Sequence, residues 1–317
     1  MAFISDLHKK CCGVVYPVIT ILLSTYGNSP FLPEFLNSLQ QQTMKGFQLV
    51  YRSDGIDSMP PECRTRLPGT TKLADETHYG VVGSYGKLIN DAPVSDYYML
   101  ADQDDIWHRE KIEKTFAAMK QAEEKWGKET PILIHSDLRV VDSSLSCIAE
   151  SMIRFQSLAP QKSTLRELLI QNNVTGCTVM FNQALRDLAG IPSEAVCHDW
   201  YLALIAAAFG KIIFVNEPLI DYRQHRDNVY GAVPRQKLLK KLFQRQLLRK
   251  KLRATQKQAA AFGARFSGRL SPEQHRLVNA WAEHLHESSY MKRLFSAWRW
   301  GFRKNDLLRT LGMWWAL

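Results

Sequence analysis

The chain has 317 residues, 45% of them hydrophobic and 23% charged, which is typical of a globular protein with one large domain and an appendage, or with two domains. Its six cysteines include no CxxC pair and no histidine at zinc spacing, so we expect a reduced, cytosolic chain without structural zinc. No apolar run is long enough to span a membrane, and the N-terminus lacks the pattern of a signal peptide, so neither is expected.

The positive charge is concentrated near the C-terminus. From Arg235 onward there are 19 Lys and Arg against 4 Asp and Glu, whereas the preceding residues hold 22 basic and 27 acidic side chains. The formal net charge of +10 is therefore a property of the C-terminal part. This asymmetry predicts a mildly acidic body, residues 1–234, followed by a basic helical region, residues 235–317.

The first half of the body alternates strand-like and helix-like segments. Residues 17–24 form a continuous apolar run, as expected of a strand buried on both faces, and Ser29 stands where it could cap a following helix. The alternation predicts an α/β fold with an open, mostly parallel sheet flanked by helices, in which ligands bind beyond the carboxyl ends of the strands. The expected strands are 17–24, 47–54, 96–105 and 131–142, and the expected helices are 29–42, 81–91 and 106–126.

The pattern is looser after residue 150. Residues 172–182 mix polar side chains, a glycine and a short apolar run. Residues 198–210 predict a strongly apolar helix that ends at a glycine, and residues 211–225 are strand-like. From Gln236 onward the pattern is mostly helical and basic.

Three carboxylates end the third expected strand, in the stretch YYMLADQDDIW. Asp102, Asp104 and Asp105 would repel one another in a cleft unless a cation lay among them. Mg²⁺ or Mn²⁺ takes carboxylate oxygens and keeps positions for phosphate, so it could neutralise the diphosphate that leaves a sugar nucleotide. The alternative interpretation is a solvated acidic turn.

Several segments, in order, resemble the family 2 glycosyltransferases, which have the GT-A (Rossmann-like) fold. In the first half they are ITILLSTYGNSPFLPEFLNSLQQQT, FQLVYRSDG, HYGVVGSYGKLI and the metal-binding motif DQDDIW. In the second half TGCTVMFN, HDW and YRQH resemble a bacterial branch of rhamnosyl and hexosyl transferases that makes surface polysaccharides. The resemblance covers roughly residues 16–231 and implies a nucleotide-binding half over about 16–106 and an acceptor half over about 130–231.

The resemblance implies a nucleotide site at the ends of the first two strands. Ser24, Thr25 and Tyr26 would line the base and the ribose, and Asp54 would contact the base. The family usually has two adjacent acids at the second turn, where this sequence has Ser53 before the aspartate. That departure leaves the preferred nucleotide open.

The resemblance also implies a metal site. Asp102 and Asp104 would face the ribose and the metal, and Asp105 would face the metal and the diphosphate. His225, in YRQH, could meet the metal or the diphosphate because imidazole tolerates Mn²⁺, or it could be a hydrogen-bonded surface histidine. Which carboxylate binds the metal directly stays open.

Asp199, which opens a helix in HDWYL, matches the catalytic base of the family. A sugar hydroxyl is a weak nucleophile at neutral pH, and a positioned carboxylate can remove its proton as the glycosyl bond forms. A single base opposite the leaving group gives displacement with inversion. The alternative is an N-terminal helix cap, a position that favours aspartate.

An acceptor pocket is implied around the TGC and HDW motifs. Close backbone approach is the physical reason to expect glycine there, and a plain turn is the alternative. The tryptophan of HDW could stack on a sugar or pack in the core. Two departures from the family pattern are His78, in place of an asparagine, and a histidine before the base, which the resembled branch shares. The implied lining residues are Thr175, Gly176, Cys177, His198 and Trp200.

The C-terminal region combines aromatic and basic residues. Leucines recur near helical spacing in residues 236–252, and residues 291–317 hold six Phe and Trp among basic side chains. This combination favours the headgroup zone of an anionic membrane, whereas the alternative is a helical subdomain that packs on the body. Nucleic acid is not an expected partner, because no recognition motif is present.

Together these features predict a metal-dependent, inverting glycosyltransferase that uses a UDP- or dTDP-linked sugar. The expected acceptor is a glycan, in particular a lipid-linked oligosaccharide of O-antigen or capsule type, at the cytoplasmic face of the cell membrane. One alternative is a sugar-phosphate nucleotidyltransferase, which the loop STYGNSPFL disfavours because it has one glycine and no basic residue. Another is a non-catalytic, membrane-associated scaffold of the same fold.

Overall fold

The computed structural model describes residues 17–55, 59, 67, 69–225, 244–283 and 289–317. The expected boundary between body and extension at residues 234 and 235 lies outside these residues, as do residues 236–243 of the leucine-rich segment. Within the described residues, no helix is both long and apolar enough to cross a membrane.

The N-terminal half forms the parallel part of the sheet. β1 is buried along almost its whole length, as its apolar run predicts, and it pairs in parallel with both β2 and β4. One expected boundary was wrong: the first helix begins at Leu32, because Ser29 accepts the amide hydrogen of Phe31 in a turn and does not cap the helix. The elements are β1 (Ile19–Thr25), α1 (Leu32–Gln40), β2 (Phe47–Ser53), β3 (Thr71–Lys72), α3 (Gly80–Asp91) and β4 (Tyr97–Ala101).

The acidic stretch lies in a turn between two strands. β4 ends at Ala101, and the next two-residue strand, β5 (Ile106–Trp107), pairs antiparallel with β9 (Lys211–Gln224). The expected helix 106–126 therefore begins later, as α4 (Lys111–Trp126). The carboxylates are held between a strand of the N-terminal half and one of the C-terminal half.

The complete sheet is mixed: most of its paired residues lie in the parallel pairs β1–β2, β1–β4, β2–β3 and β6–β9, as expected, and three short antiparallel strands are added among the described residues. Its order is β3-β2-β1-β4-β8-β6-β9-β5, with β7 paired to β6. β8 runs antiparallel to both β4 and β6, because the chain leaves β6 and re-enters β8 at the same edge of the sheet. The remaining elements of the body are β6 (Ile132–Asp142), β7 (Cys147–Ala149), α5 (Met152–Gln156), α6 (Leu165–Leu168), η1 (Gly176–Thr178), β8 (Met180–Asn182), α7 (Gln183–Leu188) and α8 (His198–Phe209).

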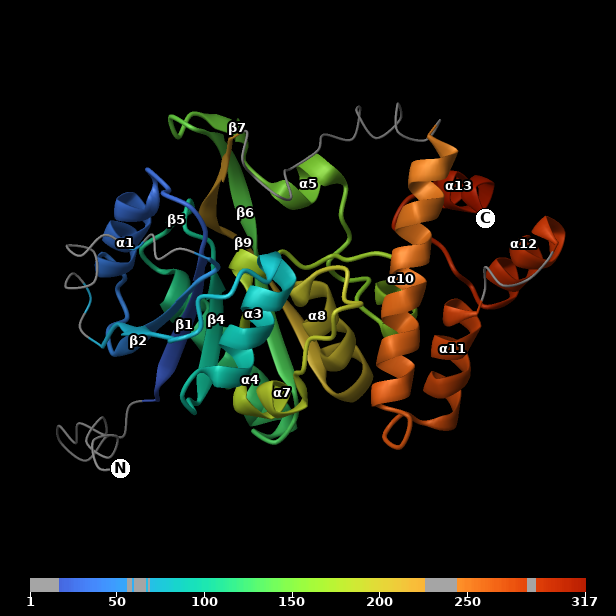
Figure 1. Ribbon diagram of the computed structural model, residues 1–317, viewed down its shortest axis with the longest axis horizontal. Helices are drawn as coiled ribbons and strands as arrows, with labels where there is room; N and C mark the ends of the chain where they lie inside the picture. Colours follow the sequence, from blue (N-terminus) through green and yellow to red (C-terminus); the bar gives the residue numbers. More distant parts are fainter. Residues whose placement is uncertain (1–16, 56–58, 60–66, 68, 226–243, 284–288) are drawn as a thin grey trace.

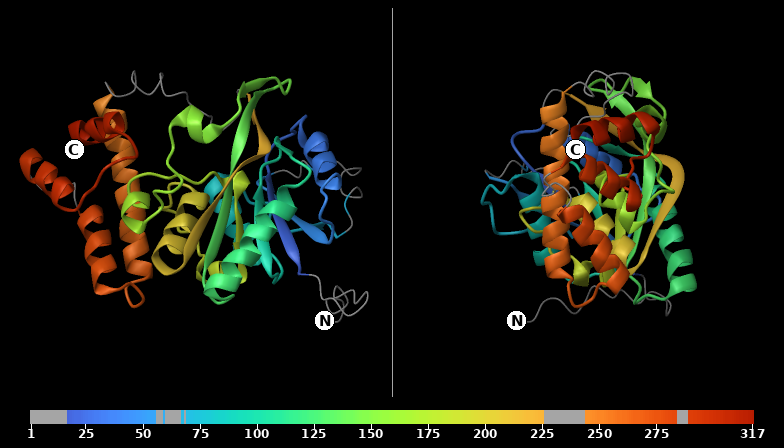
Figure 2. Two further views of the ribbon diagram at one scale, coloured as in Figure 1. Left: turned by 180° about the vertical axis from the view of Figure 1, so that it is seen from behind. Right: turned by 90° about the vertical axis from the view of Figure 1, so that its right-hand side faces the viewer.

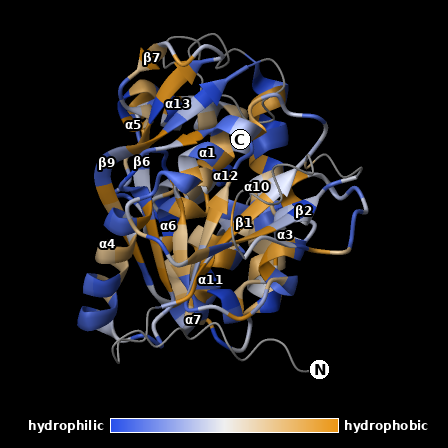
Figure 3. Ribbon diagram, turned by 90° about the vertical axis from the view of Figure 1, so that its left-hand side faces the viewer, coloured by the Kyte–Doolittle hydropathy of each residue, from blue (hydrophilic) through white to orange (hydrophobic). Residues whose placement is uncertain are grey.

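Helices cover both faces of the sheet and divide the core in two. One apolar cluster joins the sheet to α1 and α4, and the other joins it to α3 and α8. Figure 3 shows hydrophobic residues along the strands and hydrophilic residues on the outer turns of α4. This arrangement, helices on both faces of one sheet, is the α/β class that the alternation predicts.

The C-terminal residues form a group of helices at one end of the molecule (Figures 1 and 2). The ring of Phe262 lies 5.9 Å from that of Tyr201 on α8, and Phe266 lies 5.0 Å from Phe209. All four helices contribute to the apolar cluster that contains Tyr201, through residues such as Phe262, Trp281, Ala297 and Met313, as the packing alternative predicts. The four are α10 (Arg245–Arg265), α11 (Pro272–Ala282), α12 (Tyr290–Arg299) and α13 (Leu307–Ala316).

Candidate active site

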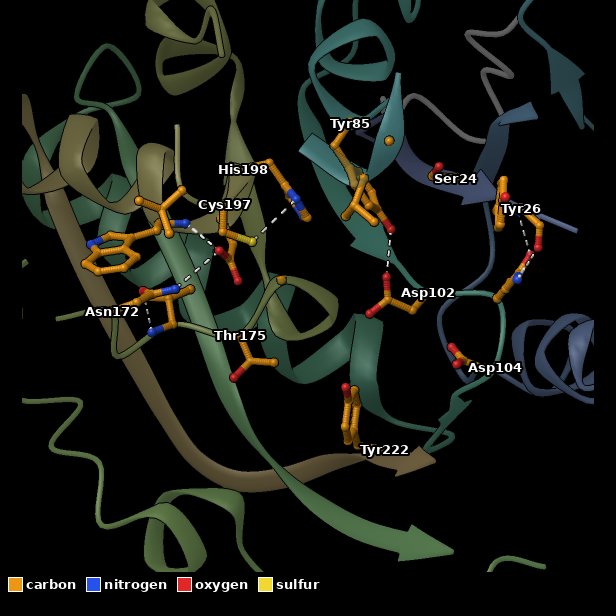
Figure 4. A pocket seen from close by; sticks show the side chains of 18 of the residues that line it. Ser24, Tyr26, Tyr85, Asp102, Asp104, Asn172, Thr175, Cys197, His198 and Tyr222 are labelled. Atoms are coloured by element: carbon orange, nitrogen blue, oxygen red, sulfur yellow. Dashed lines mark hydrogen bonds between the residues drawn. The ribbon is translucent and has the colours of Figure 1, made fainter. Parts of the chain in front are cut away.

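A cavity of about 750 Å³ lies where the carboxyl ends of β1 and β4 face the amino-terminal end of α8 (Figure 4). This is the edge of the sheet at which α/β folds bind ligands. Three of the predicted site residues, Thr25, Asp105 and Cys177, are buried and do not line it. The predicted residues that do line it are Ser24, Tyr26, Asp54, Asp102, Asp104, Thr175, Gly176, His198, Asp199, Trp200 and His225.

The end of β1 supplies one wall of the cavity. Ser24 Oγ lies 2.7 Å from Ser84 Oγ on α3, and the ring of Tyr26, which is 65% exposed, lies 5.2 Å from the ring of His78. Thr25 is directed to β2 instead, because successive side chains of a strand point to opposite faces. Of this triplet, Ser24 and Tyr26 line the cavity and Thr25 does not.

Asp54 is held by three donors at the end of β2. Arg52 Nη1 lies 2.8 Å from Oδ1, the Tyr79 amide donates to the same oxygen, and His78 Nδ1 lies 2.9 Å from Oδ2. The arginine is fully buried and anchors the carboxylate from below. His78, which departs from the pattern of the resembled family, therefore contacts the Asp54 carboxylate at the end of β2.

Asp102 stands at the first position after β4, in a crowded acidic environment. Burial and the neighbouring charge of Asp104 raise its pKa from 3.8 to about 7. The Tyr85 hydroxyl donates a hydrogen bond to Oδ1 at 2.9 Å. This carboxyl is therefore only partly ionised at neutral pH unless a cation lies nearby.

Asp104 and His225 meet at the cavity wall. His225 Nε2 lies 2.6 Å from Asp104 Oδ2, although the two residues are 121 positions apart in the chain. The buried Arg223 braces the turn from behind: its Nε donates to the backbone oxygen of Asp104 at 3.0 Å, and its Nη2 lies 2.6 Å from Glu34 Oε2. The end of β9 therefore fixes the acidic turn and presents the histidine beside it.

Asp105 faces the protein interior. Its Oδ1 accepts the backbone amide hydrogen of Arg223 at 3.2 Å, and ligand atoms of Asp102, Asp105 and Cys177 lie within 4.8 Å of one another. Burial is the main cause that raises the pKa of both Asp105 and the thiol. Lys111 lies behind this cluster, fully buried, with Nζ 3.8 Å from the centre of the Trp107 ring.

The two possible metal positions differ in their ligands. The interior group includes a thiol, which hard cations such as Mg²⁺ do not favour, and its Asp105 and Cys177 do not reach the cavity. Asp104 and His225 offer oxygen and imidazole ligands at the cavity wall, a set that suits Mn²⁺. Of the three predicted metal ligands, Asp104 and His225 are in contact at the cavity wall, whereas Asp105 belongs to the interior group.

The charge of the cavity wall is strongly negative. Four aspartates and three histidines line it, and no lysine or arginine among the described residues does so. Burial lowers the pKa of one of these histidines, His198, to about 4, so that side chain is neutral at pH 7. A diphosphate in this cavity would therefore require a cation between it and the carboxylates.

Asp199 lies on the other side of the cavity, in the first turn of α8. It is 6% exposed, and its Oδ1 accepts hydrogen bonds from Asn172 Nδ2 at 3.2 Å and from the Trp200 amide at 2.5 Å. Cys197 occupies the N-cap position, so Asp199 is not the cap. The contacts hold the carboxylate in one orientation, as a general base requires.

The cavity is narrow beside this carboxylate. A Cβ atom at Gly176 would lie 3.0 Å from His198 Nε2 and 3.5 Å from Asp199 Oδ2. The Trp200 indole donates to the Leu168 backbone oxygen at 2.5 Å. This hydrogen bond holds the ring, which lines the cavity, in place. Glycine at position 176 thus keeps open the space beside Asp199 Oδ2.

Sequence reasoning missed several residues that line the cavity. Tyr85 contacts both halves, because it donates to Asp102 and its ring stacks on that of His198 at 3.9 Å. Asn172 orients the predicted base, and Tyr222 lines the wall between the acidic turn and Thr175 (Figure 4). Amphipathic spacing within the helix 81–91 could have suggested only that Tyr85 is buried, because its partners come from distant segments.

No protein-family model matches the sequence. The chain is 20% identical over 235 residues to the dTDP-rhamnosyl transferase RfbG of Shigella flexneri, a match that covers 66% of this chain and 74% of that protein.

Solved structures match over most of the chain. Staphylococcus aureus TarS 1-349 in complex with UDP-GlcNAc has a TM-score of 0.53 and 15% identity, and covers 94% of this chain and 90% of that one. The mannosyltransferase PcManGT of Pyrobaculum calidifontis, in complex with GDP-Man and Mn²⁺, has a TM-score of 0.51 and 15% identity, with coverage of 89% and 75%. A longer TarS structure matches with a TM-score of 0.52 and 16% identity, over 85% of this chain and only 43% of that chain. The fold is therefore the GT-A fold, with a mixed sheet.

Proposed function

We propose that this chain is an inverting, metal-dependent glycosyltransferase that moves a sugar from a nucleoside diphosphate to a glycan. One observation carries the proposal: a single cavity has a crowded acidic turn with Asp104 and His225 on one side and the oriented carboxylate of Asp199 on the other. The likeness to glycosyltransferases in fold and, weakly, in sequence supports the same conclusion.

The donor side would bind the nucleotide and its diphosphate. Ser24, Tyr26 and Asp54 line the wall where a base and ribose would lie, and Thr25 would contribute only through its backbone. Asp104 and His225 would hold Mg²⁺ or Mn²⁺, with Asp105 keeping the turn in place from inside. A bound cation would neutralise the charge that develops on the departing diphosphate.

Asp199 would act as the base. A hydroxyl of the acceptor loses its proton to the carboxylate while its oxygen bonds to the anomeric carbon, and the bond from that carbon to the diphosphate breaks. Attack from the face opposite the leaving group inverts the anomeric configuration. Thr175, Gly176, His198 and Trp200 line the cavity around the carboxylate and would shape the acceptor pocket, whereas Cys177 would support it from the interior.

The resemblance and the relatives guide the choice of substrates. The donor would be UDP- or dTDP-linked, in keeping with the UDP-GlcNAc bound to TarS and the dTDP-rhamnosyl activity in the name of RfbG. The acceptor would be a lipid-linked oligosaccharide of O-antigen or capsule type at the cytoplasmic face of the cell membrane. The catalytic domain would comprise residues 1–234, and residues 235–317 would form a basic region in peripheral contact with anionic lipid.

The wall of the cavity disfavours a sugar-phosphate nucleotidyltransferase. Such an enzyme must hold a triphosphate, and no lysine or arginine among the described residues lines the cavity. Release of pyrophosphate instead of a nucleoside diphosphate would favour that alternative.

A panel of UDP- and dTDP-sugars with Mn²⁺, read by release of nucleoside diphosphate, tests the proposal. We expect turnover with at least one donor that depends on the divalent ion and is lost in Asp199→Asn when acceptor is supplied. Full activity in a metal-free enzyme would contradict the metal role, and unchanged transfer by Asp199→Asn would contradict the role of the base.

A further inference from the structure

α12 presents large apolar side chains to solvent. Met291, Phe295 and Trp298, spaced four and three residues apart, are 68%, 59% and 69% exposed. The other side of the same helix packs inward through the buried Ala297. A helix on a protein surface normally turns polar residues outward, so this outward face is not explained by folding.

α13 repeats the pattern. Leu307, Leu311 and Trp315 follow one another at intervals of four residues and are 73%, 48% and 44% exposed, whereas Met313 and Ala316 are buried. The two helices meet near one end, because the Tyr290 hydroxyl of α12 donates to the Trp314 backbone oxygen of α13 at 3.2 Å. We call the six exposed residues of these two stripes the apolar face.

Basic side chains predominate in the segment that carries the apolar face. Residues 289–317 contain six Lys and Arg and a single acid, Asp306. The carboxylate of Asp306 is paired with Arg309 Nε at 3.2 Å, so it does not offset the cations elsewhere. Lys292, Arg299 and Arg303 are exposed on or beside α12. Exposed apolar and aromatic side chains bordered by cations match the headgroup region of an anionic bilayer.

Residues 289–317 also form hydrogen bonds with the acceptor side of the cavity. Arg309 donates to the backbone oxygens of Gln156 and Ser157, at the end of α5. Asn305 bonds to the side chains of Gln171 and Asn173, which flank the residue that orients Asp199. Gln156 itself lines the cavity. The acceptor wall and the base of α13 are therefore joined by direct hydrogen bonds.

We infer that the apolar face of α12 and α13 docks on an anionic membrane and turns the acceptor side of the cavity toward the lipid surface. The second part of the inference rests on the proposed function, because it supplies the reason for bringing a lipid-linked acceptor to Asp199. The docking itself does not depend on catalysis.

Co-sedimentation with vesicles tests the docking. We expect the wild-type chain to bind vesicles that contain phosphatidylglycerol and to bind pure phosphatidylcholine much more weakly. Phe295→Ser with Trp298→Ser, or Leu311→Ser with Trp315→Ser, should lower binding about tenfold or more, since each removes two exposed apolar side chains. Lys292→Gln with Arg299→Gln should lower it about fivefold for each charge, an effect that salt abolishes.

Matched controls come from the body. Val94 and Ile148 are 77% and 48% exposed but lie far in sequence from the extension, so Val94→Ser and Ile148→Ser should bind vesicles as the wild type does. Thermal melting of each variant verifies folding, which substitutions of exposed side chains should leave intact.

Three results would overturn the inference. The wild-type chain could fail to bind anionic vesicles, the controls could lose as much binding as the stripe variants, or the stripe variants could convert a dimer to a monomer in light scattering without changing vesicle binding. Donor turnover with a soluble acceptor is measured separately. Its absence together with normal vesicle binding would reject the proposed function and leave the docking standing.

Discussion

The carboxylates on the two sides of the cavity lie in different environments. On the donor side, Asp102 and Asp104 crowd one turn, and the pKa of Asp102 rises to about 7 through burial and mutual repulsion. On the acceptor side, Asp199 lies at the start of α8 and accepts hydrogen bonds from Asn172 and the Trp200 amide. A carboxylate with donors around it can serve as a base by itself, whereas a crowded pair requires a counter-ion.

The largest expected effect is on the acceptor side. Asp199→Asn keeps the hydrogen-bonding shape and removes the basic oxygen, so transfer to acceptor should fall about 10²–10⁴-fold. Steady-state kinetics with a soluble acceptor measures it, with Asp187→Asn on the exposed surface of α7 as the control. If the folded variant transferred sugar within twofold of the wild-type rate, the claim that Asp199 serves as the base would be contradicted.

The next effect is on the donor side. Asp104→Asn should weaken the binding of Mn²⁺ and reduce turnover about 10²-fold, because the ligand pair with His225 loses its negative charge. Turnover against Mn²⁺ concentration shows the change as a shift of the half-saturating concentration. Cys177→Ala is the matched test of the interior group. It should leave that concentration unchanged, and a large shift there would place the ion in the interior instead.

Gly176→Ala should impair use of the acceptor more than use of the donor, with a smaller loss than the two aspartate variants show. The added methyl group would lie 3.0 Å from His198 Nε2, so kcat/KM for the acceptor should fall about tenfold while hydrolysis of the donor by water changes little. Gly268→Ala is the control, since a Cβ there meets nothing within 4 Å. An equal loss in both reactions would mean that the glycine supports the fold and not the acceptor pocket.

The smallest effect is on stability and its dependence on pH. The folded-state pKa of Asp102 is about 7, above its ordinary 3.8, so the folded state binds more protons and its stability falls as pH rises from about 4 to 7. His198 has the opposite sign: its folded-state pKa of about 4 makes stability fall as pH drops from 6.5 to 4. Urea unfolding of the metal-free chain measures these effects. The free energy of unfolding of Asp102→Asn should increase relative to that of the wild type as pH rises toward 8. That of His198→Gln should increase relative to the wild type as pH falls toward 4. Parallel pH curves for all three proteins would contradict these assignments.

The sequence predicts local features well. Apolar runs located β1, β2 and β6, and the break from apolar to acidic residues located the turn after β4. The first turn of α8 also lies where the HDW motif indicates, with Asp199 directed to the cavity.

What the sequence could not predict depends on contacts between distant segments. Ile106 and Trp107 look like the start of a helix, but β9 pairs with them and delays it. The direction of β8 is not encoded in its hydrophobic period, so the sequence did not predict that this strand runs antiparallel to its neighbours. The role of Arg223, a buried brace of the acidic turn, depends on partners as far away as Glu34.

Binding of UDP and dTDP, followed by calorimetry with and without Mn²⁺, tests the central claim most directly. The cavity wall has four aspartates and, among the described residues, no lysine or arginine, so we predict tight binding with the ion and at least about a hundredfold weaker binding in its absence. Equal affinity in excess EDTA, or affinity unchanged by Asp104→Asn, would contradict the account.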